Sequence, residues 1–304
     1  MSHRLPVPIS ERQNDEELLR ILRAGESAHA RARQLSSAHI SLSLLLAAGA
    51  VLGVFVSSVQ VTLTVAGALW ALVYAVGAGA WAESEFRKAA LLQEAFDTRL
   101  FDIPWNEVLA GDMPSADEVN RLARRYRGSE ERLRDYYEIR DLPRPFDVLS
   151  CILQNLAWGA RVRRRFAAVV QGGVVAWMLT GVVAGVVTQS TVSDVLLGWF
   201  VPSLGLLLLG VDTYRSQRST AAVREHTRQV ILPRMRSHAE AGMPPDQVQS
   251  LLMLARQAQD VLLRTRLDQA RVPNWFFNTF LDSDRADFAA AMEEVGGWLP
   301  GPPR

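Results

Sequence analysis

Residues 161–187 read RVRRRFAAVVQGGVVAWMLTGVVAGVV, and this stretch decides the fold class. Residues 166–187 contain no charged side chain and are about as long as the ~20 residues that an α-helix needs to cross the hydrocarbon core of a bilayer. Arg161, Arg163, Arg164 and Arg165 lie directly before this apolar run. Because basic residues mark the cytoplasmic end of such a helix, the stretch predicts a membrane span that enters from the cytoplasm.

Three further runs share this character. Residues 40–59, 61–81 and 195–211 also lack charged side chains and are long enough, or nearly so, to span a bilayer. Only 57–60 and the sequence TQSTVSD at 188–194 separate the members of each pair. The chain is therefore predicted to be all-α, an integral membrane protein with four transmembrane helices in two hairpins, 40–82 and 166–211.

The basic residues around these runs predict the topology. They are Arg31 and Arg33 before the first run, Arg87 and Lys88 after the second, and Arg215, Arg218 and Arg224 after the fourth. Neither hairpin loop contains Lys or Arg. Since cytoplasmic loops carry the excess of basic residues, both termini and residues 83–165 are predicted to be cytoplasmic. The expected location is the bacterial inner membrane, with several crossings in contact with lipid. A soluble protein with buried core helices is the alternative, and it leaves the four bracketed, charge-free runs unexplained.

The polar remainder predicts a helical cytoplasmic domain built from three segments. These are an N-terminal helix within 1–39, the central segment 83–165, and a stalk with a C-terminal segment at 212–298, followed by a disordered tail at 299–304. Helices are expected at 82–100, after Ser115 and after Ser129, at 146–165 and 212–241 as extensions of spans, at 248–262 and at 284–295. No stretch alternates as a strand would.

Composition and motifs exclude several classes of protein. The net charge of +1 gives no bulk attraction to a nucleic acid polymer. Cys151 is the single cysteine, which excludes an intrachain disulfide and a cysteine-based zinc site. The five histidines lack metal-ligand spacing, and no nucleotide-binding or hydrolase motif is present. No ionisable residue lies inside a span, which disfavours an active transporter. The prediction is a protein that is not an enzyme and has no metal or cofactor.

Small residues recur every four positions within the spans. Such faces let two helices approach closely, either inside one bundle or between subunits. The positions are Gly49 and Gly53, Gly181 and Gly185, and Gly67 and Gly79 with Ala71 and Ala75 between them. One bundle without charged residues offers no hydrophilic lining, so a homo-oligomer is expected if the protein conducts ions.

Three segments combine aromatic residues with Arg, Asn or Asp: QEAFDTRLFDIPWN at 93–106, CILQNLAWGARVRR at 151–164 and RVPNWFFNTF at 271–280. Together they resemble the SMODS-associated four-transmembrane effectors of bacterial antiphage defence. The residues that carry the resemblance are Phe96, Asp97, Pro104, Trp105, Asn106, Cys151, Asn155, Trp158, Arg161, Val272, Pro273 and Trp275. The resemblance implies a membrane effector that opens or disrupts the inner membrane when a cyclic nucleotide from a cognate nucleotidyltransferase activates it.

The same segments supply the candidate ligand residues, because aromatic faces stack on bases and guanidinium groups hold phosphates. The candidates are Arg99, Trp105, Asn106, Asn155, Arg161, Arg271 and Trp275. Trp and Arg near a membrane also sit at its interface or hold helices together, so a structural role stays open. A membrane-anchored helical scaffold that docks a soluble partner is the alternative function.

Overall fold

The computed structural model describes residues 7–55, 62, 65–66, 69–70, 72–73, 76–77, 79–139, 141–242, 244–268 and 272–298. The chain divides into two compact units, Met1–Tyr136 and Tyr137–Arg304, which are treated separately below. Every regular element among the described residues is a helix, so the predicted all-α class is confirmed for this part of the chain.

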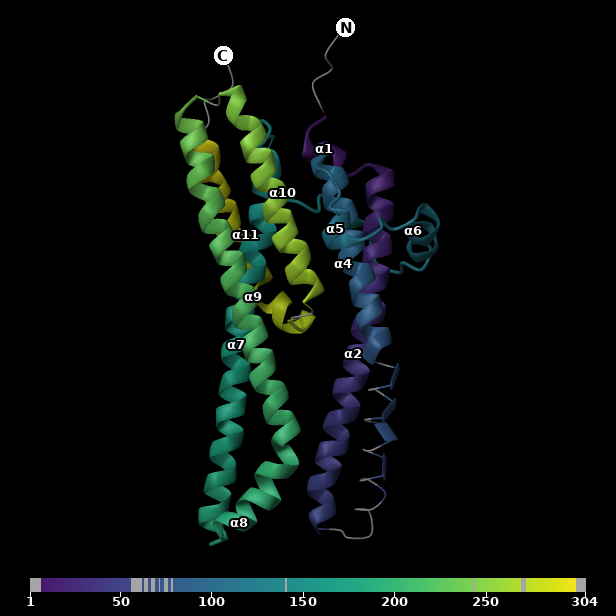
Figure 1. The fold of residues 1–304 in the computed structure, drawn as a ribbon, viewed down its shortest axis with the longest axis vertical. Coiled ribbons are helices and arrows are strands. Elements are labelled where there is room, and N and C mark those ends of the chain that lie inside the picture. The colour runs from purple at the N-terminus through teal and green to yellow at the C-terminus, as the bar shows by residue number, and fades with distance from the viewer. Residues whose placement is uncertain are drawn as a thin grey trace. The chain divides into compact units, whose positions relative to one another are not determined.

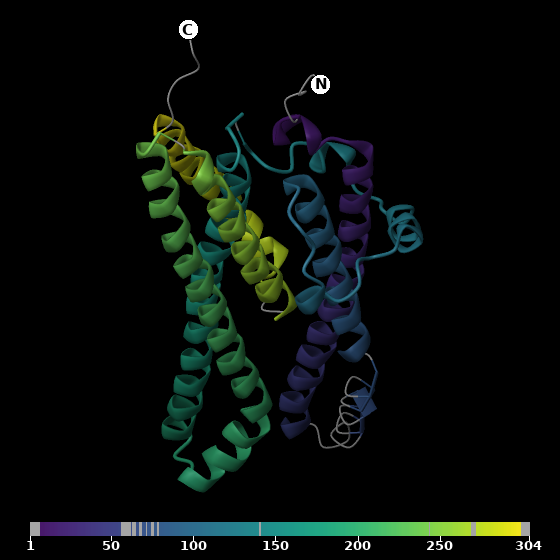
Figure 2. The same ribbon diagram turned by 45° about the horizontal axis from the view of Figure 1, so that its top comes forward.

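Unit 1 is built on two long helices, α2 (Glu16–Phe55) and α4 (Gly79–Phe101), which lie side by side (Figures 1 and 2). Ala24, Ala28 and Ala32 recur every four residues on α2 and are fully buried. Because side chains four apart share one helix face, these alanines form a stripe of small residues that lets helices pack closely.

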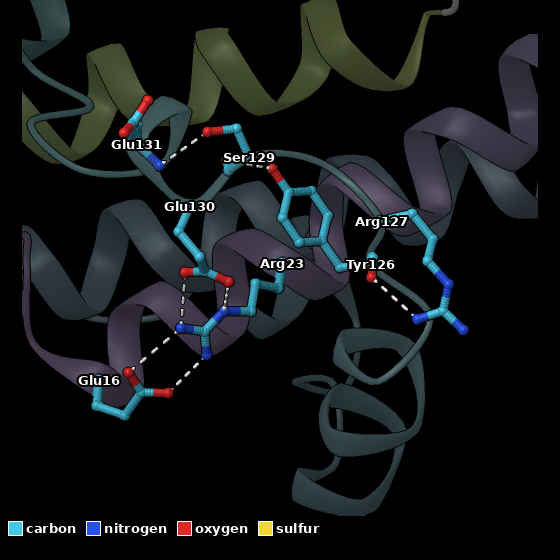
Figure 3. A network of polar contacts seen from close by, with 7 residues as sticks. All are labelled: Glu16, Arg23, Tyr126, Arg127, Ser129, Glu130 and Glu131. Carbon is cyan, nitrogen blue, oxygen red and sulfur yellow. Dashed lines mark hydrogen bonds and ion pairs between the residues drawn. The ribbon is translucent and has the colours of Figure 1, made fainter.

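Shorter helices surround this pair. They are α1 (Ile9–Arg12), α5 (Glu107–Ala110), α6 (Ala116–Ala123), which packs on α2, and the 3₁₀ turn η2 (Glu130–Arg132). Figure 3 shows how η2 is tied to α2: Arg23 donates to both carboxylate oxygens of Glu130, at 2.8 and 2.9 Å, and to Glu16 at 2.6 Å. Close by, the hydroxyl of Tyr126 donates to the Ser129 carbonyl at 2.8 Å. The network is structural.

Unit 2 contains a hairpin of two long helices, α7 (Phe146–Val187) and α9 (Val201–Glu240), side by side for much of their length (Figure 1). The short helix α8 (Val192–Val195) and the π-helical turn η3 (Leu196–Phe200) join them. Thr191 begins α8 with a capping box, in which its hydroxyl accepts from the Asp194 amide and the Asp194 carboxylate accepts from the Thr191 amide. Two more helices, α10 (Pro245–Leu267) and α11 (Asn274–Gly297), pack on the hairpin.

Most of the predicted helices are present. The one at 82–100 is α4, 146–165 continues without a break through α7, and 212–241 continues α9. The last helix begins ten residues earlier than predicted, because Pro273 provides an extended N-cap for α11. The helix predicted after Ser129 is wrong: only η2 forms, and Asp135 soon adopts a φ of 49°, which a right-handed helix does not allow.

Among the described residues, α7 is long and apolar enough to cross a membrane, and only 11% of its apolar window is buried. A core helix of a soluble protein would bury most of that window. The other three predicted spans stay predictions. Residues 56–61 and much of the second run lie outside the described part of the chain. The fourth run is divided among the end of α8, η3 and α9, and α9 reaches Asp212 about three turns after its start at Val201.

Candidate functional site

Unit 2 contains a partly open cavity of about 350 Å³ between α7, α9 and α11. Its apolar part is formed by buried side chains, among them Leu153, Phe288 and Val295. The polar part carries three arginines, three carboxylates and one tryptophan: Arg161, Arg228, Arg236, Asp284, Asp287, Glu294 and Trp298. Apolar walls with a few charged groups are typical of small-molecule sites.

Arg161 connects two of the helices around this cavity. It donates from α7 to Asp284 of α11 at 3.1 Å and also to Asp287 of α11. Arg165, one turn further along α7, donates to the same Asp284 oxygen at 3.3 Å. The Asp284 side chain is only 7% exposed, so its charge is compensated by two guanidinium groups rather than by water. Arg161 therefore holds α11 against α7 and lines the cavity.

The remaining two arginines project from α9. The guanidinium of Arg236 lies 5.9 Å from the centre of the Trp298 ring and donates to Glu240 at 2.9 Å. Arg228 pairs with Glu225 at 3.6 Å. Positions 228, 232 and 236 are four apart, so their side chains share the face of α9 that looks into the cavity. An aromatic ring beside a guanidinium is a combination that suits a base and a phosphate.

A second polar centre, in the core of unit 2, is structural. Arg224 is buried, and it donates to the Thr265 hydroxyl at 2.9 and 3.1 Å and to the Asn155 carbonyl at 3.3 Å. Burial lowers the pKa of the Arg224 guanidinium well below its ordinary value, and the charges of Arg163 and Arg266 lower this pKa further. Asn155 in turn donates to the Tyr137 hydroxyl at 2.7 Å. These hydrogen bonds join α7, α9 and α10.

The sequence comparisons identify the family. The model of the SMODS-associating 4TM effector domain matches residues 7–295, which is nearly the whole chain. The chain belongs to this family. It is also similar to a protein of Bacillus cereus (strain VD146) named probable CBASS effector molecule, with 26% identity over 219 residues, covering 67% of this chain and 71% of that relative. No solved structure matches. The predicted family is thus confirmed.

Three predicted ligand residues lie in unit 1 and have structural partners there. Arg99 donates to Glu17 at 2.6 Å. The indole of Trp105 donates to the Gly111 carbonyl at 2.8 Å, and the Asn106 side chain accepts from the Leu109 amide as the N-cap of α5. The Arg99 contact joins α4 to α2, the other two shape the loop around α5, and none of the three residues lines the cavity of unit 2.

Trp275 is 68% exposed and belongs to an aromatic cluster at the start of α11. Its ring meets Phe276 edge to face, Phe276 meets Phe166 where the apolar stretch of α7 begins, and Arg165 lies 4.3 Å from the centre of the Phe280 ring. An exposed Trp beside the end of an apolar stretch fits the membrane-interface interpretation better than ligand contact. Arg271 lies outside the described residues.

Arg161 is thus the predicted ligand residue that lines the cavity. Sequence reasoning missed its neighbours Arg228, Arg236 and Trp298. The available signal was the spacing of the two arginines eight residues apart on a helix that was itself predicted. Their carboxylate partners Glu225 and Glu240 lie on α9 itself, and Trp298 comes beside Arg236 only in the folded unit.

Gly181 and Gly185 of α7 face the segment that joins α7 to α9. A Cβ atom at Gly181 would lie 2.4 Å from Cδ1 of Trp199, whose ring stacks on Trp177 at 4.6 Å between centres. A Cβ atom at Gly185 would lie 2.4 Å from Val195. For the other four predicted packing glycines, the neighbours or the residue itself fall outside the described part of the chain: Gly49, Gly53, Gly67 and Gly79.

Proposed function

We propose that this chain is the effector of a bacterial CBASS antiphage system, and that a cyclic nucleotide made by a cognate nucleotidyltransferase causes it to open or disrupt the inner membrane. Membership of the SMODS-associating 4TM effector family and similarity to a probable CBASS effector support the first part. Neither the family nor the relative identifies which ligand activates the chain or what the chain does to the membrane; α7 and the cavity that it lines support these parts of the proposal.

The continuity of α7 carries the proposal. Leu153, Ala157 and Arg161 of this helix line the cavity, and the same helix runs unbroken to Val187 through the exposed apolar stretch. A ligand in the cavity would therefore contact a helix that itself reaches the membrane, with no loop to absorb a displacement. Ligand binding shifts the population of states only if the active state binds more tightly.

The active species is proposed to be a homo-oligomer in contact with lipid, with both termini cytoplasmic. No ionisable side chain lies in the apolar runs, so a single hairpin pair provides no hydrophilic lining for a pore. Several copies arranged around a common axis can place their mildly polar faces inward. No chemical step is required, so the chain acts as a ligand-gated effector rather than as an enzyme.

The test measures membrane potential and crosslinked oligomer size in cells that express the chain with an active or a catalytically inactive nucleotidyltransferase. We expect depolarisation, growth arrest and a larger crosslinked species with the active enzyme only. Depolarisation by a species that stays monomeric would contradict the assembly mechanism. Absence of depolarisation with every nucleotidyltransferase tried would contradict the proposed output and favour the scaffold function.

A further inference from the structure

The cavity between α7, α9 and α11 holds as many carboxylates as guanidinium groups. Arg161 is occupied by Asp284 and Asp287, Arg228 by Glu225, and Arg236 by Glu240. An anionic ligand therefore does not meet open arginines in this state, and it has to replace a carboxylate to reach one.

The carboxylates differ in how easily they can be replaced. Asp284 is 7% exposed and accepts from both Arg161 and Arg165, so displacing it from these guanidinium groups would leave a mostly buried carboxylate without a charged partner. Asp287 is 60% exposed and Glu240 is 64% exposed. Exposed ion pairs of this kind contribute little free energy, whereas a phosphate held by planar guanidinium groups forms strong charge-assisted hydrogen bonds. Exchange is therefore favourable at Asp287 and Glu240 and unfavourable at Asp284.

The size of the cavity and its aromatic wall select the ligand. The volume of about 350 Å³ is near the lower end of small-molecule sites, which span about 300–1,000 Å³. Trp298 lies in the wall beside Arg236, with its ring available next to a guanidinium group. Aromatic rings stack on bases of any sequence, and the neighbouring arginine is placed for the attached phosphate. The site therefore suits one nucleotide unit rather than a whole oligonucleotide.

We infer that this cavity binds one nucleotide unit of a phosphodiester ligand, with its base on Trp298 and its phosphate exchanged for Asp287 at Arg161 and for Glu240 at Arg236. That the ligand is a cyclic nucleotide rests on the proposed function; that one nucleotide unit binds here rests on the cavity. Exchange removes one of the two carboxylates by which α11 is held to Arg161, so occupancy and the attachment of α11 are linked.

The test measures binding to the detergent-solubilised full chain by calorimetry, with cyclic di-AMP, cyclic GMP-AMP, GMP and inorganic phosphate as probes. Asp287→Asn removes one of the two carboxylates that occupy Arg161 and is expected to bind the nucleotides about fivefold more tightly. Glu294→Gln is the matched control, because it removes the same charge from the same cavity wall without freeing Arg161. Its gain is expected to stay below about twofold.

Trp298→Ala separates a nucleotide from other phosphodiesters. It is expected to weaken nucleotide binding about tenfold and to leave phosphate binding unchanged, because only the base stacks on the ring. Nanodiscs with and without phosphatidylglycerol supply a lipid arm. Binding of that lipid alone, insensitive to Trp298→Ala, would overturn the inference in favour of a headgroup. Failure of all probes to bind would also overturn it.

The results also separate the inference from the proposed function. Equal affinities of a cyclic nucleotide for the wild type, Asp287→Asn and Glu294→Gln would overturn the exchange and leave the proposed function standing. Binding of GMP with the predicted pattern, without binding of either cyclic nucleotide, would support the site and count against cyclic-nucleotide activation.

Discussion

Replacement of Gly159 by alanine is expected to destabilise unit 2, because the added methyl group meets a buried guanidinium. A Cβ atom at this position would lie 1.8 Å from Nη1 and 2.9 Å from Cζ of Arg224. Ordinary contact requires at least about 3.4 Å, so the guanidinium must move by roughly 1.6 Å. Arg224 is surrounded by protein on all sides and cannot swing into solvent.

The magnitude follows from the contacts that this movement breaks. Arg224 makes hydrogen bonds of 2.9 and 3.1 Å to Thr265 and of 3.3 Å to the Asn155 carbonyl. Losing two such bonds to a charged group costs about 1.5 kcal/mol each. Alanine in place of glycine inside a helix returns about 1 kcal/mol. The net loss of unfolding free energy is therefore expected to be about 2 kcal/mol.

Unfolding in detergent, followed by circular dichroism, measures this loss. Gly173→Ala is the matched control, since it lies on the same helix and an added Cβ would have no neighbour within 4 Å. It is expected to match or exceed the wild type in stability. In an Arg224→Met background, Gly159→Ala should cost nothing further, because the two changes remove the same contacts. Gly159→Ala as stable as Gly173→Ala would refute the reasoning.

Two further predictions concern the second hairpin. In a Cys151→Ala background, a cysteine that replaces Ser190 in the hairpin loop is expected to react with a membrane-impermeant thiol reagent on intact spheroplasts. A cysteine that replaces the exposed Ser219 of α9 is expected to react only after lysis. The reverse pattern would contradict the predicted topology. Gly181→Leu is expected to prevent depolarisation and to destabilise the hairpin by about 1–3 kcal/mol through overpacking against Trp199. Gly172→Leu is the control, because a Cβ atom there would have no neighbour within 4 Å, and it should leave depolarisation and stability unchanged. Equal effects of the two substitutions on depolarisation and thermal stability would argue against the packing role of Gly181.

The helical class and several helix boundaries could be predicted because they depend on local patterns. The helix from 146 through the apolar stretch follows from the helical pattern of 146–165 and the charge-free run that continues it, and α6 begins after Ser115 because that hydroxyl accepts from the Glu118 amide. The failure after Ser129 has a different cause. A capping serine was present, but the backbone at Asp135 turns left-handed; Asp adopts this conformation more readily than most residue types, and its presence alone does not decide where it does so.

The site was only partly predictable, because its members come from distant segments. Arg161 was selected through its place in a family-like segment, and its partners Asp284 and Asp287 lie more than 120 positions away. Trp105 and Asn106 are also residue types able to bind a nucleotide, but their side chains have local roles in the loop around α5. A sequence pattern identifies side chains able to bind a nucleotide, and only the packing of α7, α9 and α11 distinguishes those that line a cavity.

The arginine run before the apolar stretch of α7 illustrates this limit. In the sequence it is one signal for membrane topology, yet each member has its own contact in the folded unit. Arg161 and Arg165 hold Asp284 of α11, Arg163 donates to Gln217 of α9 at 3.0 Å, and Arg164 pairs loosely with Glu225 at 3.9 Å. The residues that are predicted to orient the hairpin are therefore also those that fasten α9 and α11 to α7. A ligand that takes Arg161 from Asp287 would act at the junction between the cavity and the apolar helix.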